Sequence, residues 1–224
     1  MTRERWMALL FALGSTCFLI GPFPGYAQLV GATADAVTFF LGSILFTAGG
    51  ALQTWIAFPE RHVPHTGPAA WRAATIQSAG TLFFNVTTYQ ALHTSLSNSR
   101  YDRLVWRPDA FGSICFLVSG TIAYRASPRH GWLPARGSPG WWESSINLLG
   151  CIFFGISAIA GYLVPSTGSL LNLAWANWNT ALGAACFLAC AVATLLTGRT
   201  LKSPRLRRLH RLEDHVKRDV ERIV

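Results

Sequence analysis

Amide side chains interrupt the apolar segments of this 224-residue chain, and six of them are the residues best suited to bind a small polar molecule. They are Gln53, Gln77, Asn85, Asn147, Asn177 and Asn179. In apolar helices, amides commonly join neighbouring helices by hydrogen bonds of about 1 kcal/mol each, which is the structural interpretation. Gln77, Asn147 and Asn179 lie three or four residues before a glycine of a repeated motif. We therefore predict, as the functional alternative, a polar cavity lined by these three residues.

Cysteine and histidine side chains are the other groups that could carry chemistry. The cysteines, which all fall in apolar segments, are Cys17, Cys115, Cys151, Cys186 and Cys190. We interpret them as small apolar fillers and expect no disulfide. The stretch "PERHVPH" places Glu60, His62 and His65 at a spacing that could hold zinc with a further ligand, although such loop side chains are more often solvated. Because no nucleophile elbow, P-loop or dinucleotide-binding glycine motif occurs, we expect no catalytic residue, cofactor or metal.

Long apolar blocks must position these side chains. Hydrophobic residues make up 51% of the chain and charged residues 13%, which is about half the charged share of a typical globular protein. Six blocks nearly free of charge are long enough to cross a hydrocarbon core about 30 Å thick. Their expected ranges are 6–23, 36–58, 71–92, 109–124, 141–164 and 170–197. Because backbone in a bilayer must satisfy its own hydrogen bonds, we predict an all-α polytopic membrane protein. The short fourth block also fits a re-entrant segment.

Positive charge predicts the orientation. With six crossings, both ends of the chain fall on one face, which receives 16 of the Lys and Arg residues. The opposite face receives three, Arg100, Arg103 and Arg107, in the loop expected at "NSRYDRLVWRP". The positive-inside rule therefore predicts cytoplasmic N- and C-termini.

A glycine followed four residues later by phenylalanine occurs in all six blocks, beginning with "LGSTCF" at residues 13 to 18. The glycines are Gly14, Gly42, Gly80, Gly112, Gly150 and Gly183, and the phenylalanines are Phe18, Phe46, Phe84, Phe116, Phe154 and Phe187. A small residue follows each glycine directly, and another stands eight residues after it in all but the first block. These positions share one helix face, and small residues let helix backbones approach in lipid. We predict that the twelve residues form the helix-packing surfaces.

The spacing of the glycines predicts an internal repeat of two helices. Gly14 and Gly80 are 66 residues apart, Gly80 and Gly150 are 70 apart, and Gly42 and Gly112 are 70 apart. We predict three tandem helical hairpins in a membrane domain, 1–197, with units at about 6–58, 71–124 and 141–197.

These motifs resemble the YrhK-like family of bacterial integral membrane proteins. The resemblance rests on "DAVTFFLGSILFTAGGALQ" (35–53) and "INLLGCIFFGISAIAGYLVPSTG" (146–168) and covers most of residues 6–197. The function of that family is unknown, so the resemblance supplies no catalytic residue. It implies a small helical membrane module in the bacterial plasma membrane.

The two ends of the chain allow further interpretations. Arg3 and Arg5, an apolar run and small residues at Gly25 and Ala27 imitate a cleaved secretory signal, but the shared Gly/Phe register favours a retained helix. At the other end, residues 198–224 carry a net charge of +5 and apolar residues at three- and four-residue steps after Pro204. We predict an amphipathic cytoplasmic helix that binds anionic lipid head groups, with nucleic-acid binding and a short coiled coil as weaker alternatives.

The sequence favours a non-enzymatic role in protein interaction or membrane organisation, with the lipid bilayer and a protein partner or second copy of the chain as the partners. The alternative is a small-molecule or ion transporter with an amide-lined central cavity. The two hypotheses differ in whether Gln77, Asn147 and Asn179 line a water-accessible cavity or bond across closed helix interfaces.

Overall fold

Long helices make up nearly all of the structure. The computed structural model describes residues 1–63, 67–92, 97–127, 129–130, 133–134 and 138–197. The long helices are α1 (Arg3–Ile20), α3 (Ala32–Ala57), α4 (Gly67–Ala91), α6 (Arg107–Arg125), α7 (Pro139–Ala160) and α8 (Leu173–Thr197). The all-α prediction is confirmed, because each predicted apolar block corresponds to one of these helices. The predicted helix after Pro204 lies outside the described residues.

Short elements connect the long helices. They are α2 (Pro24–Val30), the 3-10 helix η1 (Pro59–His62), α5 (Asn98–Tyr101), the π-helical segment η2 (Asp102–Trp106), and the two-residue strands β1 (Arg129–His130), β2 (Leu133–Pro134), β3 (Leu163–Val164) and β4 (Ser169–Leu170). β1 pairs with β2, and β3 pairs with β4, both antiparallel. The fifth apolar block was predicted to continue to residue 164, but α7 ends at Ala160 and residues 163–164 form β3.

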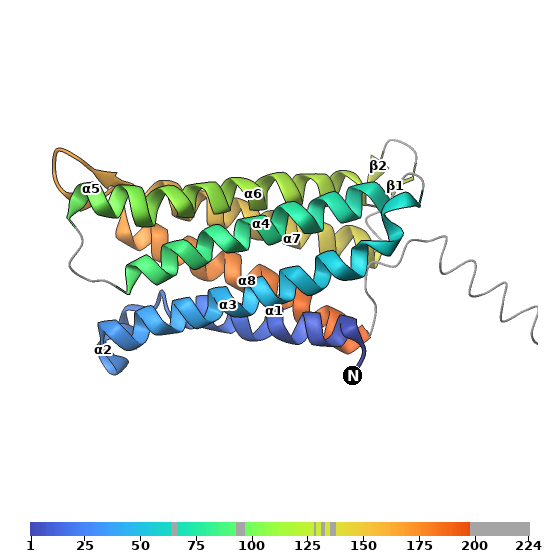
Figure 1. Cartoon of the computed structure of the whole chain (residues 1–224), viewed down its shortest axis with the longest axis horizontal. Helices are drawn as coiled ribbons and strands as arrows, with labels where there is room; N and C mark the ends of the chain where they lie inside the picture. The colour runs from blue at the N-terminus through green and yellow to red at the C-terminus, as the bar shows by residue number, and fades with distance from the viewer. Residues whose placement is uncertain (64–66, 93–96, 128, 131–132, 135–137, 198–224) are drawn as a thin grey trace, which may run out of the picture.

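The long helices form a closed ring. α1 packs against α3, α4 against α6, and α7 against α8, and further contacts join α3 to α4, α6 to α7, and α8 to α1. Figure 1 shows the helices running side by side along one long axis, with the N-terminus, β1 and β2 at one end and α2 and α5 at the other. We call these the N-terminal end and the far end of the ring.

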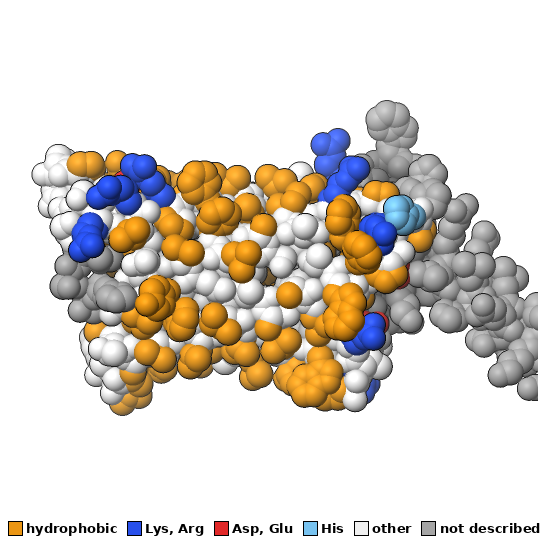
Figure 2. Space-filling model, viewed as in Figure 1, with side chains coloured by type: hydrophobic (Ala, Val, Ile, Leu, Met, Phe, Trp, Pro, Cys, Tyr) orange, Lys and Arg blue, Asp and Glu red, His pale blue; other side chains and the backbone are white. Residues whose placement is uncertain are grey.

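The outer surface of the ring is apolar between two charged ends. Figure 2 shows hydrophobic side chains along the length of the helices, with Lys and Arg gathered near the two ends. Among the described helices, α3, α7 and α8 are long and apolar enough to cross a membrane, and α1 with α2 would be a fourth if that pair, bent by 92°, is one span. α4 and α6 are more polar: α4 contains Gln77 and Asn85, and α6 begins with Arg107 and Asp109. The structure therefore supports membrane insertion for three helices, fewer than the six crossings predicted.

The segment predicted as an arginine-containing loop is helical instead. α5, η2 and α6 follow one another without a break from Asn98 to Arg125. Pro108 explains the π segment, because proline donates no backbone hydrogen bond and its ring crowds the carbonyl four residues earlier, here Leu104. A π turn before the proline widens the helix and lets it continue. The sequence pattern missed this because charged residues and proline are usual loop signals.

Each long helix receives a phenylalanine ring from its partner at its own repeat glycine. A Cβ built on Gly14 would lie 2.8 Å from Cδ2 of Phe46, and one built on Gly42 would lie 3.1 Å from Cδ2 of Phe18. In the same way, the Phe116 ring lies against Gly80 and the Phe84 ring against Gly112. In the third pair, the Phe187 ring lies against Gly150 and the Phe154 ring against Gly183. Real side chains essentially never approach to 2.8 Å, so the helices of each pair can pack this closely only because these positions carry no side chain.

The residue after each glycine is also buried, and several of these residues contact the neighbouring pair. Ser43 of α3 lies 2.8 Å from the Thr88 hydroxyl of α4, and the Ser113 hydroxyl of α6 donates to the Phe154 carbonyl of α7 at 3.3 Å. Gly50 and Gly120 stand at the same crossings, where added Cβ atoms would meet Ser78 at 3.3 Å and the Cys151 sulfur at 2.9 Å. Small side chains therefore form the contacts between pairs as well as within them.

All six repeat phenylalanines meet in one cluster at the centre of the ring. Their side chains are 2–7% exposed, and neighbouring ring centroids lie 5.0–6.1 Å apart. Most of these contacts are edge-to-face, and Phe154 and Phe187 are stacked. Aromatic pairs at such distances contribute about 0.5–1.5 kcal/mol beyond the area they bury. This cluster, which we call the phenylalanine layer, links all six long helices.

We expect Gly80→Ala to destabilise the protein by about 1–3 kcal/mol, because the new methyl group would overlap the Phe116 ring. Thermal unfolding of the purified protein in detergent measures the effect. Gly25→Ala is the matched control: it is also a helical glycine, but nothing lies within 4 Å of its Cβ position, so its melting temperature should stay the same or rise. Adding Phe116→Leu to Gly80→Ala should restore part of the loss. An unchanged melting temperature for Gly80→Ala would exclude the tight contact.

Candidate functional site

A cavity of about 210 Å³ lies inside the ring at its N-terminal end. Two rings of the phenylalanine layer, Phe46 and Phe187, are part of its wall and separate it from the far half of the ring. Because a water molecule occupies about 30 Å³ in the liquid, the cavity has the volume of roughly seven waters. A ligand that fits it without rearrangement must be small.

The cavity wall is made of equivalent positions in the three helix pairs. Seven residues before the repeat glycines of α1, α4 and α7 stand Met7, Ala73 and Glu143; six before them stand Ala8, Ala74 and Ser144; and three before them stand Phe11, Gln77 and Asn147. Eleven residues after the repeat glycines of α3, α6 and α8 stand Gln53, Ala123 and Thr194. The cavity therefore lies centrally among the three pairs. At these repeat positions the polar side chains come from α3, α4, α7 and α8, whereas those of α1 and α6 are apolar.

Gln77 is held in place by the neighbouring helix. Its side chain is 7% exposed, and its Oε1 lies 3.3 Å from the Ser119 hydroxyl of α6. Ser119 is fully buried, and its hydroxyl also lies 2.8 Å from the Ala73 carbonyl, one turn before Gln77. The Ser119 hydroxyl has one proton, and the shorter contact is to the Ala73 carbonyl, so Ser119 fixes one end of the Gln77 amide and leaves the other end to a ligand in the cavity.

Two other amides line the cavity without fixed partners. Asn147 of α7 is half-buried, and its side chain makes no hydrogen bond with the described part of the chain. Gln53 of α3 has its Oε1 buried, and within the described residues this oxygen also has no hydrogen-bond partner. An unsatisfied buried amide oxygen costs about 1–3 kcal/mol, so a bound group that donates a hydrogen bond to Gln53 would relieve that cost.

Three carboxylates add negative charge to the same cavity. Glu4 of α1, Glu60 of η1 and Glu143 of α7 all belong to its wall, and all three are half-buried. Each also interacts with another group of the protein. Negative charge in a partly closed, low-dielectric cavity attracts cations and hydrogen-bond donors more strongly than the same charge in open water.

Asn179, the third residue predicted to line the cavity, does not contribute to it. It is buried in α8, where its amide nitrogen donates to the Trp175 carbonyl at 2.8 Å. The cavity meets the first turns of α4 and α7 but the last turns of α8, so α8 runs in the opposite direction (Figure 1). A residue that precedes the glycine of α8 consequently lies beyond the phenylalanine layer. The predicted hairpins already imply that α8 and α3 run opposite to α7 and α4, which brings Thr194 and Gln53, and not Asn179, to the cavity end.

The structure also locates the residues considered for metal binding. Glu60 lines the cavity, His62 ends η1, and His65 lies outside the described residues. Among the described residues, no three His, Cys, Asp or Glu side chains stand close enough to hold a metal ion. All five cysteines are free thiols within helices.

Comparison with known proteins adds no relative. Searches of protein-family models, of functionally characterised proteins and of solved structures found no match to this chain.

We expect Asn147→Leu and Ser119→Ala to separate polar residues that serve a ligand from those that serve the fold. Asn147→Leu removes no hydrogen bond of the described chain, so the stability should stay within about 0.5 kcal/mol of the wild type. Ser119→Ala removes a buried hydroxyl that joins α6 to α4 and should cost about 1 kcal/mol. Thermal unfolding in detergent measures both. A larger loss for Asn147→Leu than for Ser119→Ala would show that Asn147 is a structural residue.

Proposed function

We propose that this protein is an integral membrane protein that binds a small hydrogen-bonding molecule in the cavity at the N-terminal end of its ring. In this proposal the six long helices cross the bilayer as three tandem hairpins. The observation that carries the proposal is the cavity itself: it is central, polar on one part of its wall, and closed on its inner side by the phenylalanine layer.

The outer surface supports insertion of the whole ring. The long helices have 18–26 residues and are therefore about 27–39 Å long, which matches a hydrocarbon core of about 30 Å. Large apolar side chains are exposed on α4 and α6 as well as on the more apolar helices, including Leu82, Val86, Phe111 and Ile114 at 45–57%. Exposed tryptophans mark both ends, Trp6 and Trp55 at one and Trp175 and Trp178 at the other, as at the two interfaces of a bilayer.

The polar residues of α4 and α6 do not oppose this placement, because several of them are turned inward. Gln77 and Thr88 of α4 are 7% and 6% exposed, and the Asn85 amide donates to Thr47 of α3 at 2.9 Å. In α6, Ser113 and Ser119 are 3% and 0% exposed. Mean hydropathy counts such residues against a span, although inside a helix ring they never meet lipid.

The sidedness is part of the same proposal. We infer that the N-terminal end of the ring, where Arg3, Arg5, Arg61, Arg72 and Arg125 lie, faces the cytoplasm of a bacterial cell. The assignment to the YrhK-like family, which rests on the two quoted motifs, belongs to this proposal as well. The cavity would then be reached from the cytoplasm.

The lining favours a neutral or cationic ligand with hydrogen-bond donors. The buried Gln53 oxygen accepts hydrogen bonds, and Glu4, Glu60 and Glu143 provide negative charge around it. A compact amine or amide meets both conditions and the volume of about 210 Å³. Because of this lining, we propose ligand binding in place of the interaction or membrane-organising role that the sequence favoured.

Transport is the second candidate, favoured by the position of the cavity within the ring. A substrate entering from the N-terminal end would meet the phenylalanine layer, whose side chains are at most 7% exposed. Passage to the far side would require these rings to separate. Binding from one side requires no such change, and for that reason we propose binding first.

Reporter fusions test the six crossings. If all six long helices cross, a reporter fused after residue 100 should lie on the opposite side of the membrane from reporters fused after residues 65 and 132. If only α3, α7 and α8 cross, all three reporters should lie on one side. Paired alkaline phosphatase and fluorescent protein fusions read the two outcomes, and the second outcome would contradict the proposal.

Thiol labelling tests the cavity. In a chain whose five cysteines are replaced by alanine, Ala123→Cys places a thiol in the cavity wall, and we expect labelling only from the side of the N-terminal end. The cationic reagent methanethiosulfonate ethylammonium should react faster than its anionic ethylsulfonate analogue, by about tenfold, because carboxylates line the cavity. Both reagents need the same thiolate, so their ratio reports the local charge.

Ser99→Cys in the same background is the matched control for sidedness, since Ser99 is exposed at the far end. It should be labelled from the opposite side and show no preference for the cation. Equal rates of the two reagents at Ala123→Cys would contradict a cation-attracting cavity, and labelling from both sides would favour transport over one-sided binding.

A further inference from the structure

A second hollow lies at the far end of the ring, away from the axis. This groove, of about 880 Å³, runs between the α5–η2 segment and the β3–β4 connection. Its wall consists of Asn98, Ser99, Asp102, Trp106, Arg107, Ile159, Tyr162, Leu163, Pro165 and Leu171. The groove shares no residue with the axial cavity and is large enough for a sizeable ligand, since typical ligand sites measure about 300–1,000 Å³.

The floor of the groove is fixed by contacts of the π-helical segment. The Trp106 indole donates to the Ala158 carbonyl of α7 at 2.9 Å, and its ring lies edge-on to Tyr162 with centroids 4.8 Å apart. On the opposite side, the Thr87 hydroxyl of α4 donates to the Val105 carbonyl at 2.9 Å. These bonds hold η2 between α4 and α7, so the groove is a preformed part of the fold.

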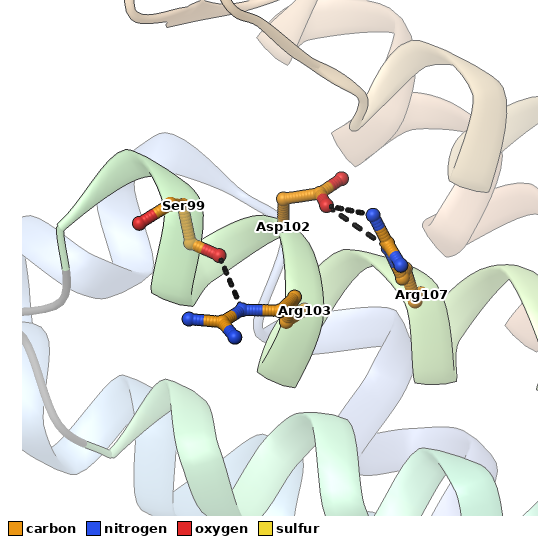
Figure 3. Close-up of polar contacts among 4 residues, drawn as sticks. All are labelled: Ser99, Asp102, Arg103 and Arg107. Carbon is orange, nitrogen blue, oxygen red and sulfur yellow. Dashed lines mark hydrogen bonds and ion pairs between the residues drawn. The ribbon is translucent and has the colours of Figure 1, made fainter.

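The polar part of the groove carries one charge of each sign. Figure 3 shows Asp102 and Arg107 paired on one side of the helix, while Arg103 extends elsewhere and bonds to the Ser99 carbonyl. Both Nε and Nη2 of Arg107 donate to the same oxygen, Oδ2 of Asp102, at 2.9 Å. Within the described residues, the other carboxylate oxygen accepts no hydrogen bond. Of the five guanidinium N–H groups, three are not used in this pair.

The charge pair is accessible to a ligand. The Arg107 side chain is 57% exposed and that of Asp102 is 26% exposed. Asn98 and Ser99 line the same groove about one turn before Asp102 and are exposed. An anion can therefore contact Arg107 while a cation contacts the free oxygen of Asp102. A group with a phosphate and an ammonium a few atoms apart is complementary to this arrangement.

The rim of the groove is apolar and faces outward. Ile159 is 66% exposed and Leu171 is 55% exposed. Trp175 and Trp178, a few residues after Leu171, are about as exposed and lie where the proposed membrane interface would be. Lipid chains can thus lie along Ile159 and Leu171 while a head group enters the groove. A soluble phosphate compound would leave these side chains uncovered.

We propose that this groove binds a phospholipid with an ethanolamine head group, its phosphate on Arg107 and its ammonium on Asp102. This would also explain why Arg107 stands at the end of the ring opposite the cytoplasmic one, against the positive-inside rule. The proposal rests on membrane insertion but not on the axial cavity, so the labelling of Ala123→Cys is unaffected if the groove binds nothing.

Native mass spectrometry of the purified full chain in detergent tests the proposal, with added phosphatidylethanolamine, phosphatidylcholine or phosphatidylglycerol of identical acyl chains. Wild type should retain phosphatidylethanolamine about tenfold more tightly than the other two, because a trimethylated ammonium cannot donate hydrogen bonds and glycerol carries no cation. Asp102→Asn should reduce retention of phosphatidylethanolamine to the level of phosphatidylcholine. Arg107→Gln should weaken all three.

Arg103→Gln is the matched control, because it removes an arginine of the same segment that does not line the groove. It should retain phosphatidylethanolamine within twofold of the wild type. Both Asp102→Asn and Arg107→Gln should fold, since an ion pair this exposed contributes about 0–1 kcal/mol. Leu171→Asp, at an exposed rim position, is an independent variant that should also lose the lipid.

Three results would overturn the proposal. Equal or tighter retention of phosphatidylglycerol by the wild type would indicate a site for anionic lipids instead. An equal loss in Arg103→Gln and Arg107→Gln would indicate a diffuse positive surface. If free phosphoethanolamine displaces the lipid at an equal concentration, the groove binds a soluble compound and the lipid assignment is wrong.

Discussion

The close approach of the two helices in each pair is the constraint on which the rest of the structure depends. Each repeat glycine accepts a phenylalanine ring from its partner, with as little as 2.6 Å between the ring and the position of a missing Cβ. The two rings of a pair thereby lie side by side and point to the centre, where they meet the rings of the other pairs. One contact type thus sets the spacing within each pair and also builds the layer that joins all three.

The same layer determines where a ligand could bind. Because the rings fill the centre of the ring of helices, the axial cavity lies at one end of it. At equivalent positions the helix pairs place different side chains around the axial cavity: Glu143, Ser144 and Asn147 of α7 are polar, whereas Met7, Ala8 and Phe11 of α1 are apolar. The three pairs are arranged alike, but the cavity that they enclose is asymmetric.

The helices could be predicted from the sequence because their apolar blocks are long and the Gly/Phe register repeats in every one of them. The predicted boundaries lie within a few residues of the observed ones for α1, α3, α4, α6, α7 and α8. One feature could not be predicted and another was missed. The π-helical segment at 102–106 depends on how the helix accommodates Pro108, and charged residues around it imitate a loop. The position of Asn179 depends on helix direction, which the hairpin prediction contained but the spacing from a glycine alone does not.

Closure of the ring by α8 on α1 has a consequence for biosynthesis. Phe18 emerges from the ribosome early, whereas its contact Phe154 is made 136 residues later. At about 5–20 residues per second this is a delay on the order of ten seconds, during which the inner faces of the first helices have no final partner. In the proposed arrangement of six membrane-spanning helices, insertion factors that shield nascent helices would have to protect α1 for that time. Nascent chains stopped before α8 should therefore be the form most readily captured by such factors.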